Sequence, residues 1–177
     1  ARTIVAEGRT VVNVAKMKTH NLATVTLATK NMQGMLTPIG CRHLCTPWPR
    51  YADDDGQGLD LRVVDRRERF DHKLADLTLG IKPQMHVVEG VVGRDGTGFN
   101  RGKNIPMGVV LAGTNPLAVD CVAACLMGFT PLEVGVLRVA QERGLPGADP
   151  AEVRVLEVCD GELCECADWQ RYRAQPP

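Results

Sequence analysis

The chain has 177 residues, enough for one domain that buries a substantial core without disulfides or metals. Lys plus Arg and Asp plus Glu both total 21, so the formal net charge is zero, and aromatic residues make up only 4%. These values argue against a nucleic-acid-binding protein, which needs a basic surface or aromatic stacking platforms. No membrane-spanning helix is predicted either, because no apolar run approaches about 20 residues.

The stretch from residue 11 to residue 34 carries the strongest functional signal. Its first part, the β-branched run at 11–14, predicts a buried strand. If the chain stays extended beyond this run, side chains alternate between two faces, and Lys16, Lys18 and His20 share one of them. The predicted strand therefore ends in a row of basic side chains.

A helix is predicted from Leu22 to Gly34, because apolar residues recur there at helical spacing and Gly34 can end it. Its polar side would carry Lys30, which is followed by Asn31. Open α/β sheets bind ligands beyond the carboxyl ends of their strands. A strand that ends in cations and leads into a helix carrying another cation is therefore a candidate anion site, with surface cations beside a loop as the alternative.

The middle of the chain is expected to be irregular before a second helix begins. Residues 37–58 combine prolines, glycines and an acidic run, which predicts a lid or, alternatively, a disordered segment. Leu61, Val63 and Val64 predict a short edge strand. Apolar residues at helical spacing then predict a helix from about Glu68 to Gly80, packed on a sheet.

Two further strands, Val87–Val92 and Met107–Gly113, are predicted on either side of a glycine-rich loop at 93–104. This loop contains four glycines and three basic residues, and backbone N–H groups in such a loop can bind an anion. The candidate ligand-binding residues of the region are Glu89, Asp95, Gly96, Gly98 and Gly102. The two carboxylates among them could instead hold a hard cation or transfer a proton, and a solvent-exposed loop is the alternative.

A third helix is predicted from Pro116 to Met127, with proline at its first position behind Asn115 as the N-cap. Asp120 is the only charge in this apolar segment, and a buried carboxylate needs a partner. We expect Asp120 to pair with Lys18 or Lys30, to serve an active site, or to lie exposed near the positive end of the helix.

The last part of the chain predicts one more helix and one more strand. A capping box at Thr130–Glu133 opens the helix, and the strand covers Val153–Val158. Strands separated by helices or long crossovers indicate the α/β class, with helices packed on a largely parallel or mixed sheet. We expect a single α/β domain over residues 1–158 and an irregular C-terminal tail at 159–177.

The seven cysteines are an odd number without the spacing of a secreted disulfide framework. We therefore expect a reducing compartment and a cytoplasmic protein. The possible soft-metal ligands fall into two groups, Cys41, His43 and Cys45 in one and Cys159, Cys164 and Cys166 in the other. Neither group matches a zinc or ferredoxin-type motif, so free thiols are favoured and metal binding is the alternative.

Several blocks of the sequence, in the same order, resemble the family catalogued as domain of unknown function 362. The blocks are Asn13–His20, Val25–Gly34, Leu74–Leu77, Val87–Val91, the glycine loop through Gly102, and Leu111–Asp120. Members of this family are often iron-sulfur proteins and usually carry an earlier half, so the resemblance implies the C-terminal part of a larger domain. An iron-sulfur cluster is a possible cofactor by this resemblance alone, because the chain has no cluster motif.

The resemblance implies one constellation of Lys18, His20, Lys30, Asn31 and Asp120. We expect an enzyme-like domain that binds an anionic small molecule or cofactor there, with Lys16 as a further ligand-binding residue and His20 transferring protons near neutral pH. One alternative is an accessory redox module that works with a ferredoxin-type iron-sulfur partner. Another is an incomplete fragment without activity.

Overall fold

The computed structural model describes residues 9–36, 63–97 and 101–174. Its main sheet contains β1 (Val12–His20), β2 (Thr24–Thr26), β3 (Met85–Thr97) and β4 (Arg101–Gly113), in the order β2-β1-β3-β4. β1 and β3 are parallel, whereas β2 pairs with β1 and β4 pairs with β3 in antiparallel fashion. The prediction of an α/β domain with a mixed sheet is confirmed.

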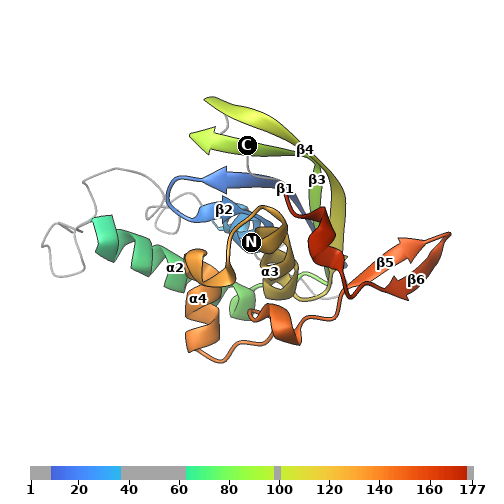
Figure 1. Ribbon diagram of the computed structural model, residues 1–177. Coiled ribbons are helices and arrows are strands. Elements are labelled where there is room, and N and C mark those ends of the chain that lie inside the picture. The colour runs from blue at the N-terminus through green and yellow to red at the C-terminus, as the bar shows by residue number, and fades with distance from the viewer. Residues whose placement is uncertain (1–8, 37–62, 98–100, 175–177) are drawn as a thin grey trace, which may run out of the picture.

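The helices α2 (Val63–Gly80), α3 (Pro116–Leu126) and α4 (Gly135–Glu142) lie on one side of this sheet, and β3 and β4 bend around α3 (Figure 1). Side chains of β1 alternate accordingly between buried and exposed positions. Ala15 and Met17 belong to the core, whereas Val12 is 49% exposed and Val14 61% exposed, so the prediction that this strand is buried on both faces is wrong. The helices therefore cover the face that carries Met17, and Lys16 lies on the exposed face.

α2 confirms the second predicted helix, because Phe70, Leu74 and Leu77 are buried along one of its sides. The helix begins at Val63 rather than near Glu68. The edge strand predicted at 61–64 is therefore wrong for Val63 and Val64, and Leu61 lies outside the described residues.

The helix predicted from Leu22 to Gly34 is wrong over residues 22–27. The chain turns after His20, returns as β2, and forms only the short α1 (Ala28–Asn31) and the 3₁₀ helix η1 (Met32–Met35). Two features explain this: the β-branched run at 24–26 favours a strand, and the His20 imidazole accepts the N–H groups of Leu22 and Ala23, which fixes the turn.

The glycine-rich segment is a β-hairpin rather than the predicted loop. Gly96 of β3 is aligned with Gly102 of β4. A Cβ atom on Gly102 would lie only 2.3 Å from the backbone oxygen of Asp95, so glycine is what allows the strands to approach here. Gly98 lies outside the described residues, as do the expected lid at 37–58 and the group Cys41, His43 and Cys45.

The C-terminal segment, which we expected to be irregular, contains regular elements. After the 3₁₀ helices η3 (Pro131–Glu133) and η4 (Pro150–Glu152) come β5 (Leu156–Cys159), β6 (Glu162–Glu165) and the 3₁₀ helix η5 (Trp169–Tyr172). The β5–β6 hairpin projects from the body of the domain (Figure 1). Cys166 and Trp169 pack against Val122 and Leu126 of α3, so this segment contributes to the core.

Candidate functional site

The carboxyl ends of β1 and β3 lie at the same edge of the sheet, because the two strands are parallel. Lys18 and Arg94 are aligned across them, so both side chains project from the same face of the sheet. His20 follows two residues after Lys18 and shares its face. Lys18 and Lys30 lie near His20, and Arg94 is aligned with Lys18; we call these three cations the cationic cluster, in which only Arg94 was outside the predicted constellation.

His20 is held in one tautomer. Its Nδ1 atom accepts the backbone N–H groups of Leu22 and Ala23, each at 3.1 Å, so the ring proton is on Nε2. Burial, and then the nearby charges of Lys30 and Lys18, lower the pKa of His20 from 6.5 to about 4. His20 is therefore neutral at pH 7, and the expectation that it transfers protons with an ordinary pKa is wrong for this state.

Lys30 reaches His20 from α1. Its ammonium lies 5.7 Å from the centre of the Phe70 ring and donates to Oε1 of Gln33 at 3.3 Å. Lys16, by contrast, forms an ion pair with Glu89 on the exposed face. The structure thus groups Lys18, His20 and Lys30. Lys16 and Glu89, which we expected to contact the ligand, instead pair with each other.

Asp120 is buried, at 2% exposed, but it does not pair with Lys18 or Lys30 as predicted. Its two carboxylate oxygens accept the backbone N–H groups of Ala28, at 2.7 Å, and Thr29, at 2.9 Å. Burial raises the pKa of Asp120 to about 6, and the hydrogen bonds from Thr29 and Ala28 oppose this rise. Asp120 therefore caps the first turn of α1 and acts as a positioning residue for the helix that carries Lys30.

Asn31 holds the other end of α1 to the sheet. Its side-chain amide donates to Oδ1 of Asn13 at 2.7 Å and to the backbone oxygen of Val14 at 2.9 Å. Both of its N–H donors are thus used inside the fold. This arrangement leaves Asn31 its side-chain oxygen for the hydrogen-bonding role that we expect of it in the site.

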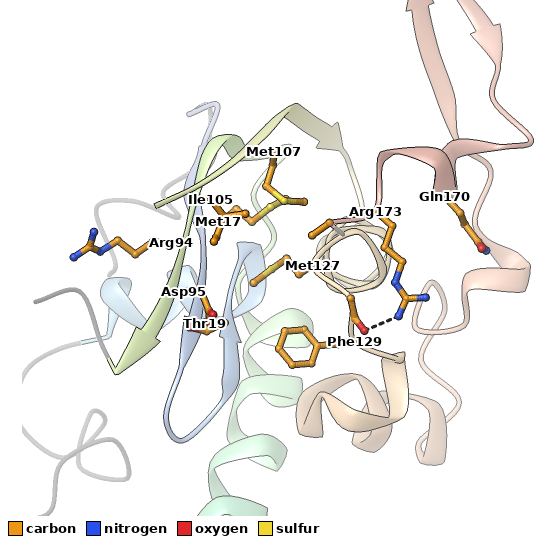
Figure 2. Close-up of a pocket in the computed structure, with 13 residues that line it drawn as sticks. Met17, Thr19, Arg94, Asp95, Ile105, Met107, Met127, Phe129, Gln170 and Arg173 are labelled. Carbon is orange, nitrogen blue, oxygen red and sulfur yellow. Dashed lines mark hydrogen bonds between the residues drawn. The ribbon is translucent and has the colours of Figure 1, made fainter. Parts of the chain in front are cut away.

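A cavity of about 690 Å³ opens on the helix-covered side of the same strand ends. Its apolar walls are formed by Met17, Ile105, Met107, Met127 and Phe129 (Figure 2). Asp95 and Thr19 lie together at one side of it, Arg173 lies at the other, and the Arg94 side chain points away (Figure 2). Thr19 Oγ1 accepts the N–H of Gly96 at 3.0 Å, which ties the end of β1 to the hairpin.

Asp95 is the predicted site residue that lines this cavity, whereas Gly96 and Gly102 serve the pairing of β3 with β4. Sequence reasoning missed the methionine-rich walls because their residues come from three separate parts of the chain, β1, β4 and the segment after α3. It also missed Asn13, although an amide within a run of β-branched residues is a signal for an internal hydrogen-bond network.

No group of three or more His, Cys, Asp or Glu side chains within 9–36, 63–97 and 101–174 could hold a metal ion. The described cysteines therefore do not gather into a site that fits an iron-sulfur cluster. In the part of the chain that the structure describes, no helix is long and apolar enough to cross a membrane.

Comparisons with known proteins give one curated relative and one family. The chain is 23% identical over 141 residues to the thylakoid-associated protein sll1697 of Synechocystis sp. (strain ATCC 27184 / PCC 6803 / Kazusa), covering 76% of this chain and 37% of that protein. It thus spans little more than a third of this relative's length, and no solved structure matches it. Residues 2–125 match the family described as Domain of unknown function (DUF362), and the chain belongs to that family.

Proposed function

We propose that this chain binds an anionic small molecule at the cationic cluster. The observation that carries the proposal is that Lys30 and Lys18 lie near enough to His20 to disfavour its charged form, while Arg94 is aligned with Lys18. Carboxylates and phosphates form strong, charge-assisted hydrogen bonds with Lys and Arg, so three cationic side chains beside a neutral imidazole suit an anionic ligand.

The turn that locks His20 also determines what its ring can offer. Because Nδ1 accepts two backbone N–H groups, Nε2 is a hydrogen-bond donor. A bound anion would counter the charges of Lys30 and Lys18 and raise the pKa of His20 towards neutrality. Binding would then be accompanied by proton uptake near pH 5 to 6, where free His20 is neutral.

The probe for this proposal is inorganic phosphate, followed by NMR of the His20 ring across a pH titration. We expect phosphate to raise the pKa of His20 in the wild-type chain and to bind several-fold more weakly to Lys18→Gln. Arg154→Gln is the matched control, because Arg154 pairs with Glu165 beyond the cluster and its loss changes the net charge equally. A pKa of His20 that phosphate leaves unchanged, or equal weakening in both variants, would refute the proposal.

A second candidate function is binding of an apolar small molecule in the 690 Å³ cavity, which its five apolar walls favour. The probe is indole, followed through the methyl resonances of selectively labelled methionines. We expect the signals of Met107 and Met127 to shift, whereas the signal of Met85, which does not line the cavity, should not. Equal shifts of all three would indicate nonspecific association and contradict the assignment.

A further inference from the structure

A second, smaller cavity lies at the opposite end of the sheet from the cationic cluster. It has a volume of about 270 Å³ and is bounded by the start of β3, the segment before α3 and the end of α2. Its lining includes His86, Lys82, Thr114, Leu79, Leu117 and Leu145. No residue of the cationic cluster lines it, so it is an independent site.

A chain of three side chains fixes the protonation of His86. Asn31 donates to Oδ1 of Asn13, so the amide of Asn13 must present its nitrogen to its other two partners. That nitrogen lies 2.8 Å from the backbone oxygen of Ala28 and 3.0 Å from Nδ1 of His86. One amide N–H goes to each, which makes Nδ1 an acceptor and places the ring proton on Nε2.

The Nε2–H donor of His86 is left without an acceptor among the residues that the structure describes. His86 is only 1% exposed, yet its ring lines the cavity while Nδ1 is turned towards Asn13. Nε2 is not among the fully enclosed polar atoms that lack a partner, so it is reached from the cavity, and an acceptor that enters there gains a hydrogen bond from it. The cavity therefore has a hydrogen-bond donor directed at whatever occupies it.

The surroundings favour a negatively charged acceptor. Lys82 lies exposed at the cavity, and the positive end of α3 begins there at Pro116. Asn115 already accepts the N–H groups of Leu117 and Ala118, so the helix contributes its dipole rather than free donors. The remaining walls are largely aliphatic, which suits a short hydrocarbon tail.

We propose that this cavity binds a short-chain monocarboxylate. The carboxylate accepts the Nε2–H of His86 and lies near Lys82, and the hydrocarbon tail contacts Leu79 and Leu145. Burial also lowers the pKa of His86, so the ring stays neutral at pH 7 and donates only through Nε2.

The experiment is a titration of the wild-type chain with butyrate, followed by the ring ¹⁵N and ¹H resonances of His86. We expect saturable shifts at Nε2 and none at His20, which separates this site from the cationic cluster. Butyramide, the neutral analogue, should bind at least several-fold more weakly. His86 signals that do not respond to butyrate would overturn the proposal and indicate that water occupies the cavity. An equal response to butyramide would overturn it as well, because the negative charge would then have no role.

The role of Lys82 is tested with Lys82→Gln, an exposed substitution that should leave the fold intact. We expect about two- to fivefold weaker butyrate binding at low salt, the size of an exposed charge interaction. Arg154→Gln, which removes the same charge elsewhere, should leave butyrate binding unchanged. Equal weakening in both variants would refute the placement of the carboxylate near Lys82.

Discussion

Gly135 of α4 lies directly against Asp71 of α2, and this contact leads to a sharp prediction. A Cβ atom on Gly135 would lie 1.8 Å from Oδ2 of Asp71, far inside any allowed contact. Asp71 is 2% exposed, so its carboxylate has little free space into which it can move. We predict that Gly135→Ala separates α4 from α2 and lowers the free energy of unfolding by about 2–3 kcal/mol, the cost of overpacking.

Removing the carboxylate should remove the conflict. Burial, and then the charge of Glu68, raise the pKa of Asp71 from 3.8 to about 6, so the ionised form is disfavoured by at most about 3 kcal/mol at pH 7. Asp71→Ala relieves this penalty but loses attractions to Arg138 and Arg67, and we expect a net change within about 1 kcal/mol. In that background, Gly135→Ala should cost less than about 1 kcal/mol.

The assay is urea unfolding at pH 7.5, followed by circular dichroism, for the wild type, both single variants and the double variant. The expected coupling energy between the two positions is about 2 kcal/mol. Gly80→Ala is the control, because a Cβ atom there would meet no atom within 4 Å. Wild-type stability of Gly135→Ala, or an equal loss with and without Asp71, would refute the steric argument.

Three further predictions concern the site and the elements that position it. Lys30→Met should raise the pKa of His20 by up to about one pH unit, as measured by NMR titration, because burial remains; an unchanged pKa would place Lys30 too far away. The pKa of Asp120 is about 6 in the folded protein and 3.8 ordinarily, so the folded state binds a proton more tightly than the unfolded state does. The stability that this proton contributes is lost as the pH rises from about 4 to 6. Asp120→Asn should therefore gain up to about 3 kcal/mol relative to wild type between pH 4 and pH 7 in urea unfolding, and parallel profiles would contradict this. Gly102→Ala should lower the unfolding free energy by about 2 kcal/mol in the same assay, because its Cβ would clash with the backbone oxygen of Asp95, and unchanged stability would contradict the hairpin pairing.

Local signals in the sequence were sufficient for some elements. The helix predicted from Pro116 to Met127 is α3, which ends one residue earlier. Asn115 caps it as the sequence pattern indicates, because its side chain accepts the N–H groups of Leu117 and Ala118. Capping depends on residues close in sequence, so a single chain carries the necessary information.

Long-range contacts were not predictable in the same way. Asp120 bonds to backbone N–H groups about 90 residues earlier in the chain, and backbone groups leave no residue-type signal. Arg94 joins Lys18 because four residues of β3, but one of β1, lie between the Lys16–Glu89 and Lys18–Arg94 alignments. This irregularity changes which residues face each other, and nothing in the local sequence of either strand specifies it.

Helix α1 has only four residues, too few to persist as an isolated helix. It exists because Asp120 accepts the N–H groups at its start while Asn31 anchors its end to β1. The position of the Lys30 ammonium therefore depends on side chains that do not contact it. Evolutionary changes at Asp120 or Asn13 would therefore alter the geometry of the cationic cluster without changing any of its charged residues. A search for what sets this geometry should begin with these buried residues rather than with the charged ones.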